Sequence, residues 1–123
     1  MTRFLVLFCL VFISAKAFSQ DTARGQKLFE DCRACHAIER GQQGVGPDLH
    51  GVVGRAIGSA SGYDEYSAAM KSRNGKWTVE QLDEFLRNPQ QSIPGNAMGF
   101  AGIPDQKLRQ ALVQYLSKQA ETH

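Results

Sequence analysis

Apolar side chains recur at steps of three and four residues in three parts of the chain, which is the spacing that places them on one face of a helix. This pattern predicts helices over about 22–35, over 78–88 and over about 105–118. Thr78, with Gln81 three residues later, is the signature of a capping box at a helix start. In the first helix, one face carries Gly25, Leu28, Phe29, Cys32 and Cys35. The side chains expected to face the core are Val79, Leu82, Phe85 and Leu86 in the second helix and Leu108, Leu112, Tyr115 and Leu116 in the third.

Glycine and proline separate these helices by long loops. Residues 41–62 are rich in glycine and are expected to form a loop, followed by a short helix over about 67–72. Residues 89–104 are expected to lack regular structure, because Pro94-Gly95 and Gly99 interrupt them. Since no stretch alternates convincingly between apolar and polar residues, we predict an all-α fold with loops that are long for a bundle of this size.

The first 19 residues have the composition of a secretory signal peptide. Arg3 precedes the apolar run 4–13, and small residues follow as far as Ser19. This run is too short to span a bilayer as a helix. We therefore expect export, cleavage near Ser19 or Gln20, and a single domain formed by residues 20–123. Retention of the segment as a membrane tether is the alternative.

Charge is balanced in the expected domain. The chain has 14 Lys and Arg against 12 Asp and Glu, for a net charge of +2, and two of the basic residues, Arg3 and Lys16, lie in the expected signal peptide. The domain therefore lacks the excess of basic residues that nucleic-acid binding requires. A domain of about 100 residues is also near the size at which a polypeptide core alone gives marginal stability, which leaves room for another group to complete the core.

The segment Cys-Arg-Ala-Cys-His at 32–36 carries the clearest chemistry. On a helix, Cys32, Cys35 and His36 point to the same side. Two thiols so placed can add to the two vinyl groups of one haem while the histidine reaches its iron, which is the c-type haem attachment pattern. We therefore expect one haem c, bound covalently through Cys32 and Cys35. The only other cysteine, Cys9, lies in the expected signal peptide.

Three other uses of the cysteine pair fit less well. A thioredoxin-like redox pair belongs beside a βαβ pattern, which this sequence lacks. A zinc site could take His50 as a fourth ligand, but no second ligand pair stands at finger or ribbon spacing. A disulfide between residues three apart closes too small a loop to add much stability.

Further motifs accompany the cysteine pair in a fixed order. From about residue 25 to residue 116 the chain resembles the class I cytochromes c of the mitochondrial and bacterial c2 type. The resemblance implies a small all-α cytochrome c fold, in which the N- and C-terminal helices pack together with two or three further helices and long loops around one haem. The motifs are CRACH at 32–36, GPDLHGVVGR at 46–55, YSAAMK at 66–71, WT at 77–78, NP at 88–89 and IPGNAMGFAGI at 93–103.

A second axial ligand of the iron, besides His36, is expected to be a methionine. Met70 is predicted to lie on a helix, where methionine usually fills a core, whereas Met98 lies in a loop interrupted by proline and glycine. Met98 also matches the ligand position of the family, so we expect His36 and Met98 to be the two iron ligands. His50 is the competing donor, but it matches a position that the family leaves on the surface.

The resemblance also implies roles for residues around the haem. The carbonyl of Pro47 is expected to accept a hydrogen bond from the second ring nitrogen of His36. Arg55, Tyr66 and Trp77 are expected to surround the haem propionates, and Gly25 and Phe29 to pack against the last helix at Leu112 and Tyr115. The residues expected to pack against the haem ring are Leu49, Leu86 and Phe100.

As a function, the resemblance implies a soluble, monomeric, periplasmic one-electron carrier, not an enzyme. Its partners would be respiratory or dehydrogenase redox proteins that dock transiently at the haem edge. A gas sensor or peroxidase with a labile Met98 is the alternative. Phe85 replaces a tyrosine that the family often has near the methionine sulfur. Lysines that ring the haem edge in mitochondrial cytochromes c are replaced here by Asp31, Gln42, Gln43, Gln90, Gln91 and Ala97.

Overall fold

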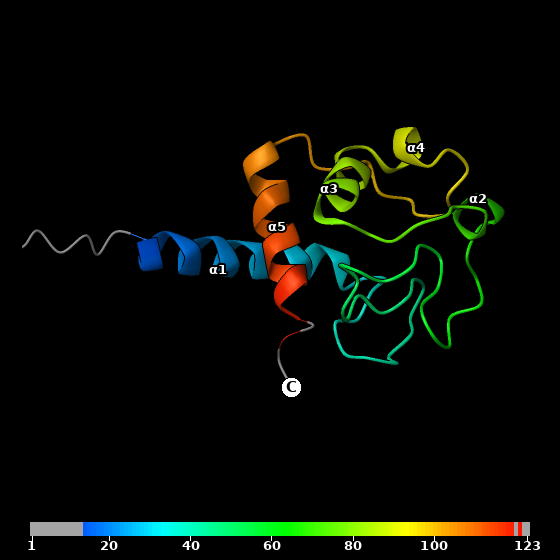
Figure 1. The fold of residues 1–123 in the computed structure, drawn as a ribbon, viewed down its shortest axis with the longest axis horizontal. Helices are drawn as coiled ribbons and strands as arrows, with labels where there is room; N and C mark the ends of the chain where they lie inside the picture. Colours follow the sequence, from blue (N-terminus) through cyan, green and yellow to red (C-terminus); the bar gives the residue numbers. More distant parts are fainter. Residues whose placement is uncertain (1–13, 120, 122–123) are drawn as a thin grey trace, which may run out of the picture.

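The computed structural model describes residues 14–119 and 121 (Figure 1). In this part of the chain the regular structure is helical, and the only β pairing is an isolated bridge between Ala56 and Lys76. The predicted all-α class is therefore confirmed. The helices are α1 (Ser14–Cys32), α2 (Ala68–Lys71), α3 (Val79–Arg87), α4 (Pro89–Ser92) and α5 (Gln106–Lys118).

Helices α1 and α5 cross each other, and their contact is the most extensive one between helices in the described part of the chain (Figure 1). Phe29 on α1 is completely buried, and the centre of its ring lies 5.6 Å from that of Tyr115 on α5. At the crossing, a Cβ atom added to Gly25 would overlap the carbonyl oxygen of Ala111 and lie 2.7 Å from Tyr115 Cβ. Glycine is needed at position 25 because no side chain fits between the two helices, and the expected contact with α5 is present.

Helix α3 packs against α5 and begins as the capping signature predicts. The hydroxyl of Thr78 accepts a hydrogen bond of 3.1 Å from the backbone nitrogen of Gln81. Three of the four side chains expected to face the core are buried, but Val79 is 46% exposed, so that expectation is wrong. Trp77, just before the cap, packs on Phe85 and fills the core at this end of α3.

Two predictions about helices differ from the structure: the extent of the first helix and the absence of a helix in residues 89–104. Within the described residues, helix α1 already includes Ser14 and ends at Cys32. The amides of Cys35 and His36 then both donate to the Cys32 carbonyl, which closes a turn instead of continuing the helix. The prediction that 89–104 lacks regular structure is wrong for α4. The side chain of Asn88 caps α4, and proline is tolerated at the first helical position because the amide hydrogen it lacks would have no partner there.

The expected signal peptide falls largely outside the described residues. The apolar run 4–13 is not described, whereas the expected cleavage position at Ser19–Gln20 lies within α1. Within the described part of the chain, no helix combines the length and apolar character needed to cross a membrane.

Candidate functional site

The predicted site residues gather around two adjoining cavities between α1, α3, α5 and the loops. The outer cavity, of about 450 Å³, and the inner cavity, of about 90 Å³, have five lining residues in common: Cys32, His36, Pro47, Tyr66 and Met98. Cys35 and Phe100 line the outer cavity only, and Leu49, Arg55, Trp77 and Leu86 line the inner cavity only. Every residue expected to bind the cofactor therefore borders one of the two cavities.

The wall of the inner cavity is mostly apolar and comes from distant parts of the chain. The resemblance to known cytochromes had drawn attention to Phe85 and Leu112, but it had not assigned haem binding to any of the six further residues that line this cavity. They are Val52 and Met70 from the loop region and α2, Leu82 and Phe85 from α3, and Leu112 and Leu116 from α5. An apolar wall of this kind excludes water from whatever the cavity holds.

The two cysteines lie at the end of α1 with different exposure. Cys32 is half-buried, and burial raises the pKa of its thiol to about 11, with the charges of Asp31 and Cys35 adding to the shift. Cys35 is exposed in the following turn. Both cysteines line the outer cavity, so a single group bound there could react with both thiols.

His36 is held by the loop that faces it. Its Nδ1 atom donates a hydrogen bond of 2.7 Å to the carbonyl oxygen of Pro47. Burial lowers the pKa of His36, the bond to Pro47 opposes this, and the positive charge of Arg55 lowers the pKa further. The imidazole is therefore neutral at pH 7, and with its hydrogen on Nδ1 it presents the lone pair of Nε2, which is the form that binds a metal.

Gly46 presses directly against the His36 ring. A Cβ atom at position 46 would lie 2.8 Å from His36 Nδ1, closer than real side chains approach. The amide of Gly46 also donates to the carbonyl of Cys35 at 2.8 Å, which ties this loop to the turn that carries the cysteines. Glycine at position 46 thus allows the loop to clamp the imidazole.

Met98 lies in a loop organised by Asn96, a buried residue that the sequence had not marked. The side-chain oxygen of Asn96 accepts from the amide of Met98 at 2.9 Å, and its nitrogen donates to the carbonyls of Pro89 and Ile93, both at 2.8 Å. Gln90 donates to the backbone oxygens of Asn96 and Met98. These bonds hold Met98 in place against both cavities.

The two competing donors occupy different places. Met70, on α2, lines the inner cavity but not the outer one. His50 lines neither cavity. Of the three residues considered for the second ligand position, only Met98 borders both cavities together with His36.

Arg55 and Tyr66 offer donors at the cavity walls. The Nε atom of Arg55 is buried and has no hydrogen-bond partner among residues 14–119 and 121. The hydroxyl of Tyr66 accepts from the amide of Ala60 at 2.9 Å, which leaves its own hydrogen for another acceptor. An orphaned buried donor on a guanidinium suits an anionic group such as a haem propionate.

The donor set therefore fits a c-type haem. Two thiols, a neutral imidazole and a thioether border one cavity system with apolar walls, and Arg55, whose buried Nε lacks a hydrogen-bond partner among the described residues, lines the inner cavity. Cys32 and Cys35 would hold the porphyrin, His36 the iron, and Arg55 and Tyr66 the propionates.

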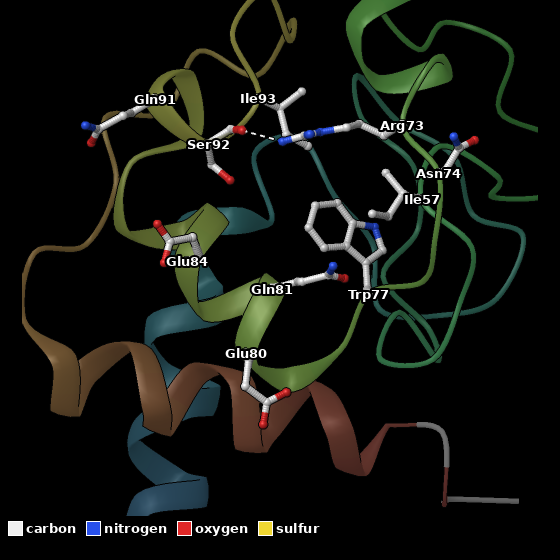
Figure 2. A pocket seen from close by; sticks show the side chains of 10 residues that line it. All are labelled: Ile57, Arg73, Asn74, Trp77, Glu80, Gln81, Glu84, Gln91, Ser92 and Ile93. Carbon is white, nitrogen blue, oxygen red and sulfur yellow. Dashed lines mark hydrogen bonds between the residues drawn. The ribbon is translucent and has the colours of Figure 1, made fainter.

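A third hollow, of about 540 Å³, lies on the surface beyond Trp77 (Figure 2). Its lining is largely polar, and the guanidinium of Arg73 crosses it to donate to the carbonyl of Ser92 at 2.6 Å (Figure 2). It contains no cysteine, histidine or methionine, although it is the largest of the three. Trp77 borders both this hollow and the inner cavity and so separates them.

Comparison with known proteins agrees with the site. A family model described as cytochrome c matches residues 22–120. The chain is 44% identical over 99 residues to a cytochrome c homolog of Bradyrhizobium diazoefficiens, covering 80% of this chain and 54% of that protein. It is 39% identical over 113 residues to cytochrome c2 of Blastochloris viridis, covering 91% and 88%. The solved structure of cytochrome cH from Methylobacterium extorquens has a TM-score of 0.72 and 40% identity, covering 78% of this chain and 96% of that one.

A small all-α domain with this attachment motif beside an apolar cavity is a c-type cytochrome. The chain belongs to the cytochrome c family, and its cofactor is one haem c attached through Cys32 and Cys35. It spans only about half the length of the Bradyrhizobium relative.

The contact of Gly46 with the imidazole makes a specific prediction. Gly46→Ala places a methyl group against His36 and is expected to lower the free energy of unfolding of the haem-loaded protein by about 1–3 kcal/mol, the usual cost of overpacking. Denaturant unfolding followed at the Soret band measures this. Gln42→Ala, exposed on the same loop, is the control. An unfolding free energy within about 0.5 kcal/mol of the wild type would contradict the clamp.

Proposed function

We propose that this protein is a monohaem one-electron carrier with His36 and Met98 as the axial ligands of the iron, acting as an electron-transfer protein and not as an enzyme. The observation that carries the proposal is the placement of these two side chains on the same two cavities. The His36 ring is held by its hydrogen bond to Pro47, and the backbone of Met98 is held by Asn96. When bound, the haem supplies an iron that changes reversibly between the ferric and ferrous states by one electron.

The protein side of this function is to hold the ligands still. His36 is fixed by Pro47 and Gly46, and the backbone of Met98 is fixed by Asn96 and Gln90. A pair of ligands restrained in this way needs little rearrangement when the charge of the iron changes. The apolar walls of the inner cavity favour the less charged ferrous state, so the reduction potential should be high.

Met98 is preferred over Met70 as the second ligand. Met98 borders the outer cavity together with both cysteines and His36, whereas Met70 borders only the inner cavity. The backbone amide of Met70 is used to form the first turn of α2, in which it donates to the hydroxyl of Ser67. This placement supports a packing role for Met70.

The redox partners would dock at the opening of the outer cavity. Val45, at 73% exposed, and Ala97 lie at this opening with Asp31 and Glu65. The lining residues of this cavity within the described chain include these two carboxylates and no lysine or arginine. A partner that recognises a ring of lysines would therefore gain little attraction here, and we propose transient docking through a small, mostly uncharged patch.

We also propose a periplasmic location after removal of the first 19 residues. Support comes from the composition of that segment and from the requirement that haem be attached to an exported chain. A membrane-tethered carrier is the outcome if the segment is retained.

The assignment of Met98 can be tested against Met70 directly. Ferric cytochromes with a methionine ligand have a weak sulfur-to-iron charge-transfer band in the far red. We expect Met98→Ala to abolish this band and to let the reduced protein bind carbon monoxide, while Met70→Ala keeps the band. If the wild type lacks the band, the iron has another ligand or an open position, and a gas sensor or peroxidase becomes the better description.

The docking proposal predicts a weak dependence on salt. The rate constant for oxidation by a mitochondrial-type oxidase is expected to change by less than about threefold between roughly 10 and 200 mM ionic strength, because no ring of like charges steers the encounter. Ala97→Lys should steepen the dependence. A wild-type rate that falls as sharply with salt as that of a basic cytochrome would contradict the proposal.

The location proposal is tested by the intact mass of the haem-loaded protein after expression with export. We expect a chain that begins at or next to Gln20. Ala17→Phe replaces a small residue before the cleavage position and should block processing. A wild-type protein that keeps its first 19 residues would show that the segment is a tether.

A further inference from the structure

Asp48 is a buried carboxylate beside the haem site whose role the family resemblance does not explain. It is 4% exposed and follows Pro47, the residue that accepts the hydrogen bond of His36. Burying a carboxylate is costly unless its oxygens are satisfied by donors. The surroundings of Asp48 must therefore be built to hold a negative charge.

The donors around Asp48 come from the loop on both sides of it. Its Oδ2 atom accepts from the amide of Gly41 at 3.3 Å and from the side chain of Gln43 at 3.0 Å. Its Oδ1 atom accepts from the amide of His50 at 3.1 Å and faces Nη1 of Arg55 at 3.5 Å. Gln43 is thus part of this network and not simply a surface replacement for a lysine.

The guanidinium of Arg55 is held by the same segment. Nη2 donates to the carbonyl of Asp48 at 2.9 Å, and Nη1 donates to the carbonyl of His50 at 3.4 Å as well as to the Asp48 carboxylate. Both terminal nitrogens are therefore used on the Asp48 side. Nε is the one guanidinium nitrogen that remains buried and without a partner, on a side chain that lines the inner cavity.

We propose that Asp48 is a positioning residue that holds Arg55 with Nε available to a haem propionate and offsets the guanidinium charge, so that it lowers the reduction potential of the haem. The inference rests on the proposed haem carrier and extends it to a residue outside the ligand set. A positive charge near the iron favours the ferrous state, and a neighbouring carboxylate cancels part of this effect.

The sign of the effect follows from this arrangement. Removing the negative charge of Asp48 leaves the positive charge of Arg55 uncompensated and favours ferrous iron, which raises the potential. One elementary charge acting over roughly 17 Å at an effective dielectric constant of about 20 shifts such an equilibrium by about fivefold. This corresponds to about 40 mV at 59 mV per tenfold change.

The test is the midpoint potential of haem-loaded variants, measured by spectroelectrochemistry. Asp48→Asn is expected to shift the ferric–ferrous equilibrium about fivefold toward ferrous iron, and Asp48→Glu, which keeps the charge, to stay within about twofold of the wild type. In an Arg55→Gln background, Asp48→Asn should give a smaller shift than in the wild type, because only the direct field of the carboxylate is then removed and the part that acts through Arg55 is already absent.

A matched control is available in a second ion pair. Arg109 on α5 is buried and pairs with Asp83 on α3 at 3.1 Å, and neither residue lines the cavities. Asp83→Asn also removes one carboxylate from a buried arginine, so it should lower stability without moving the potential. A shift equal to that of Asp48→Asn would mean that net charge alone matters, and it would overturn the proposal.

Two further outcomes would also overturn the proposal. In the first, Asp48→Asn unfolds more easily but keeps the wild-type potential, which would make Asp48 purely structural. In the second, the full shift persists in the Arg55→Gln background, so that Asp48 does not act through Arg55. If Asp48→Asn fails to take up haem, Gln43→Ala loosens the same network without removing charge, and an unchanged potential there would reject positioning. The far-red band, recorded on every sample, reports independently on Met98 ligation.

Discussion

The hydrogen bond from His36 to the carbonyl of Pro47 is the contact on which the site depends. It joins the turn after α1, which carries the cysteines, to the loop that contains Asp48 and Arg55, and it sets which imidazole nitrogen presents its lone pair. Because Pro47 has no amide hydrogen and Gly46 has no side chain, this loop can approach the ring closely. The position of the loop that contains Asp48 and Arg55 therefore depends on its close contact with the His36 ring.

Two buried polar side chains then organise the two halves of the site. Asp48 gathers donors from residues 41–55, and Asn96 gathers the backbone of residues 89–98. Each is satisfied by several partners, which is the condition under which a buried polar group orders its surroundings at acceptable cost. Long loops, which have little regular structure of their own, are thereby held against an apolar cavity.

Much of this arrangement could be predicted from local patterns. The apolar spacing marked α1, α3 and α5, and the cysteine pair with its histidine identified the cofactor. Two expectations failed where local signals compete. Proline and glycine in residues 89–104 suggested an irregular loop, although Asn88 caps the short helix α4 there. Val79 was expected to be buried, but it is exposed, and Trp77 fills the core at this end of α3. The roles of Asn96 and Asp48 were missed, because a polar residue in a loop gives no sign of burial until distant segments cover it.

The sequence by itself determined the chemistry of attachment, since two thiols and an imidazole at this spacing suit one haem wherever the helix lies. It also indicated most of the helix positions that would be buried, because periodicity is a local property. Only the tertiary structure brought Met98 to the cavities that His36 lines, and only it placed Asp48 beside Arg55. These contacts join separate loops, so they depend on how α1, α3 and α5 pack around the cavity, and no local pattern records that packing.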